Sequence, residues 1–409
     1  MGPADPPAAG PAIGGQDARR IVAALAITQT IGYGTLYYAF AVFLTPLTAD
    51  LHTTTTAVTG TFTASVLTSA ALAVPVGRWL DRRGGRALMT AGSLAGAVLL
   101  VAWSQVHGMW QLYAVQIGIG AAGAASLYEA AFAVVIAWHG PRERPNAILA
   151  LTVVAGFAST VFLPLTGWLV EAYGWRAALL ILAALQAFTV PLHALVIRAP
   201  ANPPCRATSR PAREGSPLRL GAALTDRAFW LLAIGFTANT AAISVITVHL
   251  VAALTTWGHT PTFAATTAGL FGVLSVTGRL AATGLQRRFR TAAVVAAVFA
   301  LQAAAAAALP LIGRNAVAAV IGVIGFGVGF GVGTIARPVL LADRYDTGRY
   351  ASIAGVLAIP MTLAKAAAPL TAAALYARTG TYTPVFVLTG VVCVVAALAL
   401  VGTAGSRSV

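Results

Sequence analysis

The chain has 409 residues, of which 58% are hydrophobic and 9% are charged, and its mean hydropathy is +0.82. A soluble globular protein carries about 25% charged residues, so this composition argues against a soluble enzyme and indicates a polytopic membrane protein. The net charge of +15 does not point to nucleic acid, because the arginines gather in short connectors between apolar runs. Two cysteines and six scattered histidines favour neither a disulfide framework nor a metal site.

Apolar runs of about 20 residues, long enough to cross a bilayer, occur twelve times along the chain. We therefore expect an all-α integral membrane protein, with twelve transmembrane helices in two pseudo-symmetric six-helix bundles. The expected spans are 21–48, 56–80, 87–106, 110–138, 146–172, 175–198, 228–257, 262–286, 291–312, 315–341, 350–377 and 383–404. The expected domains are a disordered tail 1–18, an N-terminal bundle 19–198, a cytoplasmic linker 199–227, a C-terminal bundle 228–404 and a tail 405–409.

The arginines predict the orientation of these spans. Of 26 basic residues, 25 are Arg and one is Lys365; 20 of the arginines fall at one set of span ends and three at the other. Because cytoplasmic loops carry the excess of Arg and Lys, both termini and the linker are expected in the cytoplasm. The protein is then expected in a bacterial inner or plasma membrane as a multi-pass monomer, with the lipid bilayer as its surroundings.

The two halves also resemble each other at a constant offset. Residues 164–166 read Pro-Leu-Thr in span 5, and the same letters recur at 369–371 in span 11, 205 positions later (369 − 164). The basic connector after span 2 recurs after span 8 at the same offset (287 − 82). The common offset predicts an internal repeat of six helices, in which the substrate binds at mid-depth between the halves.

The connector after span 2, GRWLDRRGGR at residues 77–86, carries the first informative motif. It resembles the G-x-L-x-D-R-x-G-R-R pattern of the major facilitator superfamily, and this resemblance implies the major facilitator fold and a transport function. Gly77 would allow close helix packing. An acid and arginines beside a helix end would form ion pairs and hydrogen bonds that stabilise one conformation and break in the other. The residues expected to form this conformational switch are Gly77, Asp81, Arg82 and Arg86.

Arg279 in span 8 and Lys365 in span 11 are cations inside apolar runs. Lys365 has about ten or more residues of span on either side, so its side chain cannot easily reach the membrane surface. An ionisable side chain at this depth costs a few kcal/mol or more unless it is paired or faces water. The side chain of Arg279 could extend to the membrane surface, and either cation could have a structural partner. Alternatively, an anionic substrate would balance them, because the spans hold only one acid at similar depth.

A narrower resemblance follows from Gly278-Arg279-Leu280, from Gly355 through Lys365 to Pro369, and from residues 32–44. The chain resembles the monocarboxylate-transporter and oxalate–formate-antiporter branch of the superfamily. This implies that Arg279 binds a substrate carboxylate and that Lys365 joins it. The chain departs from the animal carriers in having Ser275 where they have Asp and in having no Lys in span 1. Proton coupling by the animal scheme is therefore not expected.

Glu129 in span 4 is the one acid that lies inside an apolar run at a depth similar to that of Arg279 and Lys365. Burial disfavours its charged form and a nearby cation favours it, a balance that suits a group which gains and loses a proton. Three interpretations remain open: a proton-coupling site, a fixed counter-ion to Arg279 or Lys365, and a structural residue. The second would remove part of the argument for an anionic substrate.

Polar and aromatic residues in other spans complete the candidate site. Tyr33 and Tyr37 share a helix face in span 1, and Tyr38 lies about 100° round it. Their hydroxyl groups could donate to a carboxylate, or the rings could simply pack. Asn239 and His249 in span 7 are further candidates, Asn239 for substrate and His249 for a proton relay.

No catalytic constellation, nucleotide-binding loop or metal-ligand spacing is found, so we expect no enzyme activity, no cofactor and no nucleic-acid partner. The sequence favours a secondary transporter that moves a small organic anion, a mono- or dicarboxylate, by alternating access with proton coupling or exchange. The alternative is a drug or metabolite efflux antiporter in which the buried charges serve proton coupling.

Overall fold

The computed structural model is all-helical over the part that it describes, residues 15–139, 143–197, 225–286, 288–344 and 350–404. The N-terminal half contains α1 (Gly15–Tyr33), a π-helical turn η1 (Gly34–Tyr38), α2 (Ala39–Asp50), α3 (Thr55–Arg83), α4 (Gly85–Ser104), α5 (Met109–Ser126), α6 (Tyr128–Trp138), α7 (Arg144–Ala155), α8 (Ala158–Ala187) and α9 (Thr189–Val196). The C-terminal half contains α11 (Arg227–Thr256), α12 (Pro261–Gln286), α13 (Thr291–Ile312), α14 (Ala316–Gly327), α15 (Val332–Arg344), α16 (Tyr350–Thr379) and α17 (Thr383–Ala404).

These helices make twelve membrane crossings, as expected. Ten helical segments are long and apolar enough to span a membrane. One of them, Asn146–Val196, has 51 residues and reverses direction at Gly174, where φ is +79°, so it makes two crossings. The remaining crossing is the segment from α1 to α2, which η1 divides at mid-depth. The first helix begins at Gly15, inside the tail that we expected to be disordered.

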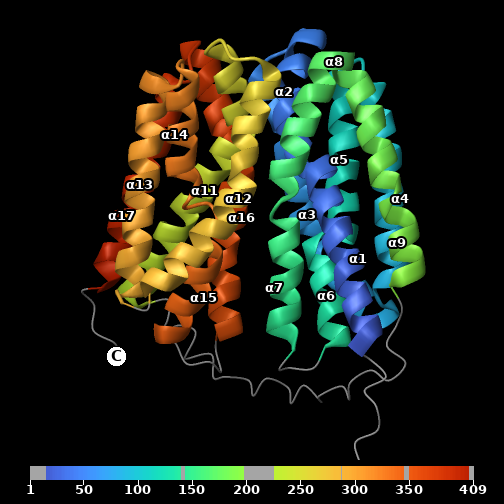
Figure 1. Ribbon diagram of the computed structural model, residues 1–409, viewed down its shortest axis with the longest axis horizontal. Helices are drawn as coiled ribbons and strands as arrows, with labels where there is room; N and C mark the ends of the chain where they lie inside the picture. The colour runs from blue at the N-terminus through green and yellow to red at the C-terminus, as the bar shows by residue number, and fades with distance from the viewer. Residues whose placement is uncertain (1–14, 140–142, 198–224, 287, 345–349, 405–409) are drawn as a thin grey trace, which may run out of the picture.

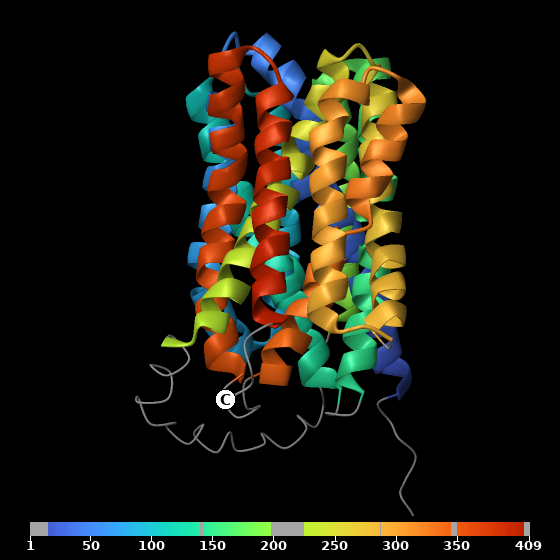
Figure 2. The ribbon, with the colours of Figure 1, turned by 90° about the vertical axis from the view of Figure 1, so that its left-hand side faces the viewer.

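The crossings form two bundles that stand side by side with their axes roughly parallel (Figures 1 and 2). We call the end where α9 stops and α11 starts the linker end, and the opposite end the far end. The bundles touch mainly through three helix pairs, α2 with α11, α3 with α16, and α8 with α12.

The hydrophobic core shows where the two bundles are joined. One cluster of buried residues runs through both bundles and includes Phe40 and Trp103 of the first bundle with Phe271 and Phe326 of the second. Towards the linker end the buried residues separate into two clusters, one confined to each bundle. The bundles are thus packed together over the far half and have separate cores in the linker half.

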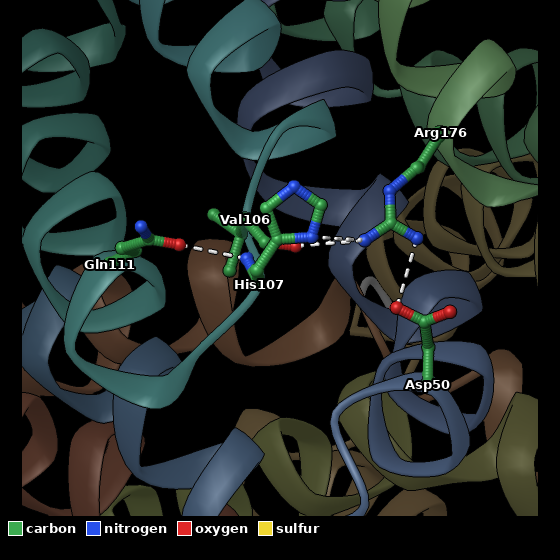
Figure 3. A network of polar contacts seen from close by, with 5 residues as sticks. All are labelled: Asp50, Val106, His107, Gln111 and Arg176. Carbon is green, nitrogen blue, oxygen red and sulfur yellow. Dashed lines mark hydrogen bonds and ion pairs between the residues drawn. The ribbon is translucent and has the colours of Figure 1, made fainter.

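A polar network closes the far end of the N-terminal bundle (Figure 3). Arg176 donates to the carboxylate of Asp50 at 2.9 Å and to the backbone carbonyl of Val106 at 2.9 Å. Its guanidinium lies 3.3 Å from Nδ1 of His107, whose backbone N–H donates to Gln111. The network ties the end of α2 to the α4–α5 turn and to the start of the second crossing of α8.

Candidate functional site

Several crossings, the fifth at residues 156–157 among them, change their helical geometry near mid-depth, and three of these breaks lie at the candidate site. In the first crossing, η1 replaces one α-helical turn, and the N–H of Ala39 donates to Gly34 O. In the fourth, Leu127 has extended backbone angles and separates α5 from α6. In the tenth, residues 328–331 separate α14 from α15. Helix breaks at this depth are typical of substrate sites in membrane transporters, where irregular backbone is tolerated only away from lipid.

The breaks in the fourth and tenth crossings are related by the repeat. Leu127 lies 204 positions before Gly331 (331 − 127), close to the offset of 205 in the sequence. At Leu127, the break in the fourth crossing, the amide of Gln29 donates to the backbone carbonyl of Ser126 at 2.8 Å. The first N–H groups of α6, at Tyr128 and Glu129, have no partner within their own helix. Each break therefore brings the positive end of a half-helix to mid-depth.

Arg279 lies directly against residues 328–331, the break in the tenth crossing. A Cβ on Gly331 would come within 2.6 Å of Nε of Arg279, and a Cβ on Gly278 would overlap the carbonyl oxygen of Val328. Only glycine permits this approach of α12 to residues 328–331. The guanidinium donates to the hydroxyl of Ser275 at 3.1 Å, the position where the animal carriers have Asp.

Lys365 lies beside a proline kink in α16. Pro369 has no N–H, so the carbonyl of Lys365 four residues earlier has no helical partner. The hydroxyl of Ser244 in α11 donates to that carbonyl at 2.7 Å. The hydroxyl of Thr63, from α3 of the other bundle, donates to the next carbonyl, that of Ala366, at 2.8 Å. The segment that carries Lys365 is thus held by both bundles.

The side chain of Lys365 points between the bundles. Its Nζ lies 4.8 Å from the ring centre of Tyr37, which belongs to the N-terminal bundle. Ile359 and Leu363, which are 60% and 57% exposed, lie on the outward face of α16. Lys365 lies about 200° round the helix from Leu363, so it is on the opposite, inward face. Although it faces inwards, Lys365 is partly exposed.

Tyrosines of the N-terminal bundle form the opposite wall. The rings of Tyr33 and Tyr37 lie 6.1 Å apart, those of Tyr37 and Tyr38 lie 5.2 Å apart, and Tyr128 stands 4.5 Å from Tyr33. Arg279, in α12 of the other bundle, is close enough to Tyr38 and Tyr128 to interact with them electrostatically. The structure therefore brings together five residues predicted from the sequence with one that was not, Tyr128; the five are Arg279, Lys365, Tyr33, Tyr37 and Tyr38.

Glu129 is an exposed residue in the first turn of α6, on the N-terminal side of the same site. It interacts electrostatically with Lys365, but the carboxylate and Nζ lie beyond ion-pair distance, which is 4.0 Å. Glu129 is therefore a neighbour of the cation and not a bonded counter-ion in this conformation.

Two predicted residues lie elsewhere. Asn239 is 3% exposed and donates to the amide oxygen of Gln302 at 2.9 Å, so it packs inside the C-terminal bundle. His249 is fully buried, and its Nε2 lies 2.8 Å from the carbonyl oxygen of Pro369. Because a carbonyl only accepts, Nε2 carries the hydrogen. His249 thus supports the far side of the kink one turn beyond Lys365.

The predicted switch residues lie at the linker end of α3 and the start of α4. A Cβ at Gly77 would meet no atom within 4 Å, so the close packing expected there is not made in this conformation. Arg82 and Arg86 are exposed, and the side chain of Asp81 falls outside the described part. The separate cores of the bundles at this end account for the lack of a close neighbour at Gly77.

The fold matches solved transporters at low sequence identity. A bacterial homologue of the human lysosomal transporter Spinster, in an inward-facing and occupied conformation, has a TM-score of 0.74 at 16% identity, covering 95% of this chain and 97% of that chain. The nucleoside transporter NupG has a TM-score of 0.74 at 15% identity, covering 96% of this chain and 100% of that chain. No curated protein matches the sequence. The model of the Major Facilitator Superfamily matches residues 25–369, most of the chain, and the protein therefore belongs to that superfamily.

Proposed function

We propose that this protein is a secondary active transporter that moves a small organic anion, a mono- or dicarboxylate, between the two bundles by alternating access. The observation that carries the proposal is the meeting of Lys365 and Arg279 with the tyrosines of the opposite bundle at mid-depth. An ammonium group at this depth needs a partner or water, and no carboxylate of the described residues forms an ion pair with Lys365. A substrate carboxylate would supply the missing charge.

The positions of the tyrosines support the same assignment. Their hydroxyl groups can donate to a carboxylate, and their rings flank the cations from the other bundle. A bound anion would therefore contact both bundles at once. This is the requirement for coupling substrate binding to the relative movement of the halves.

The core arrangement supports alternating access. The far half is sealed by a core shared between the bundles, and the linker half is not. With the linker and both termini in the cytoplasm of the inner membrane, as the arginine distribution favours, this is the cytoplasm-facing state of a monomer. In the opposite state, the switch residues Gly77, Asp81, Arg82 and Arg86 would pack against the other bundle.

We assign the coupling of anion transport to protons to Glu129, and His249 is a second candidate for this role. Glu129 is exposed and lies near Lys365, so an anion bound at the lysine would have a carboxylate as its neighbour. Exchange of one anion for another remains the other mode compatible with two fixed cations. If the anion is transported together with protons, transport depends on Glu129. If one anion is exchanged for another, transport does not depend on Glu129.

A second function, efflux of a drug or hydrophobic metabolite against protons, is favoured by one observation. The wall formed by the N-terminal bundle is mostly aromatic, with Phe62 beside Tyr37 and Phe132 stacked on Tyr128. In that case Glu129 and Lys365 would form the coupling pair.

Uptake into proteoliposomes of radiolabelled lactate, oxalate and formate tests the proposal. We expect saturable transport of at least one of the three, and a loss of about 100-fold or more in Lys365→Ala and Arg279→Ala, as for removal of a buried charge partner. Arg288→Ala, which removes an exposed arginine at the linker end, is the control and should transport normally. Full activity of both site variants would exclude the anion and favour efflux.

A further inference from the structure

A third cation, Arg337, lies in α15 of the C-terminal bundle, three residues beyond the apolar segment Ala316–Thr334. It follows Gly331 by six residues, so it is about 9 Å further towards the linker end along α15. In the described part of the chain, its one polar contact is with Sδ of Met361 at 3.4 Å. A thioether is a weak acceptor and does not neutralise a guanidinium. Among the residues that the structure describes, no acid pairs with Arg337, which is partly exposed.

The contact with Met361 places the guanidinium on the inner side of α16. Met361 precedes Lys365 by four residues, so both lie on one helix face about 6 Å apart along the axis. That face is turned away from the outward face, on which Ile359 and Leu363 lie. Arg337 therefore lies in line with Lys365, one turn closer to the linker end.

The internal repeat gives the same placement independently. Subtracting the offset of 205 from 337 gives Phe132 in α6. The ring of Phe132 stacks on Tyr128 at 5.0 Å, and Tyr128 interacts with Arg279 of the other bundle. This face of α6 looks towards the C-terminal bundle. By pseudo-symmetry, the corresponding face of α15, which carries Arg337, looks towards the N-terminal bundle.

We propose that Arg337 forms an outer anion-binding subsite between the linker end and the Arg279–Lys365 site. An anion entering from the linker end, where the two cores are separate, meets Arg337 first and then moves one turn to Lys365. The subsite takes a carboxylate, because a planar guanidinium binds that group with two parallel hydrogen bonds. An anion entering from the far end reaches Lys365 without passing Arg337. The inference rests on the proposed function.

Sided transport kinetics test this subsite. Radiolabelled oxalate and lactate are supplied to reconstituted protein from the linker side or from the far side, and KM is measured for each. We expect Arg337→Gln to raise the linker-side KM about tenfold and to leave the far-side KM unchanged. The linker-side KM of the unaltered protein should rise with salt, because exposed charges are screened, and this dependence should weaken in the variant. Arg337→Lys keeps the charge, so its linker-side KM should stay close to that of the unaltered protein.

The matched control is Arg288→Gln, which removes an exposed linker-end charge outside α15 and should leave both KM values unchanged. An equal rise of KM on both sides in Arg337→Gln, or no rise on either side, overturns the outer subsite while Arg279→Ala still tests the central one. If Arg337→Gln does not fold, a linker-side KM that is insensitive to salt in both the unaltered protein and Arg337→Lys overturns it equally. Absence of anion transport by the unaltered protein overturns the proposed function itself.

Discussion

Glu171 is expected to hold the far end closed. It lies in α8, and its carboxylate accepts from the hydroxyl of Thr262 at 2.5 Å and from the backbone N–H of Thr262 at 3.3 Å, at the first turn of α12 in the other bundle. Hydrogen bonds to a charged group contribute about 1.5–3 kcal/mol. A carboxylate at a helix N-terminus adds about 0.3–1 kcal/mol. Because Glu171 is exposed and the second bond is long, we take about 1–2 kcal/mol for the whole contact.

This contact crosses between the bundles and can exist only while the far end is closed. Glu171→Ala should therefore raise the ratio of far-open to far-closed protein by a factor of about 5–30. The ratio can be read from distances between spin labels on Ala49→Cys in one bundle and Val317→Cys in the other. The background would carry Cys205→Ala and Cys393→Ala.

Glu171→Gln should give a smaller shift, because an amide oxygen still accepts but carries no charge. The control is Glu143→Gln, which removes an equally exposed carboxylate at the linker end. An unchanged distance distribution in Glu171→Ala would refute the reasoning, as would an equal change in the control.

Two further substitutions test the geometry of the site. Gly278→Ala should abolish anion transport and lower the thermal unfolding temperature by an amount equivalent to about 1–3 kcal/mol, since its Cβ would overlap Val328 O. The matched Gly284→Ala, which meets no atom within 4 Å, should be neutral or slightly stabilising in the same melt. Thr35→Val removes the hydroxyl that lies 2.8 Å from the Gln186 amide beside the π-helical turn, and should cost about 1–3 kcal/mol and raise KM. Thr35→Ser keeps the hydroxyl, and a melt or KM equal to that of Thr35→Val would contradict this account.

The number of membrane crossings could be predicted from the sequence because it depends on local composition. Lipid offers no hydrogen-bonding partners, so each apolar run of sufficient length forms a helix that satisfies its own backbone. The repeat was visible for a similar reason, since the residues at equivalent turns of the two halves kept the same spacing. The observed breaks at Leu127 and Gly331 fit this offset, yet no residue pattern marked either of them as a break.

Arg279 and Lys365 were recognisable as candidates because a cation inside an apolar run is costly wherever the helix faces. For the uncharged polar residues, the sequence did not distinguish those that line the site from those that pack inside one bundle. Asn239 looked equivalent to a site residue, but its partner, Gln302, lies 63 residues away in α13. Tyr128 and Arg337 were overlooked for the converse reason: nothing in their neighbours showed that their helix faces look across the interface.

Charge, hydropathy and spacing by themselves determined that the chain crosses a membrane twelve times, in two related halves, with cations buried in the second. Each of these properties is set by a stretch no longer than one span or by a constant offset along the chain. Only the tertiary structure decided that Lys365 meets Tyr37, that Arg279 rests on Gly331, and that the shared core seals the far end. These contacts depend on the rotation and tilt of whole helices, which are set by packing between segments hundreds of residues apart.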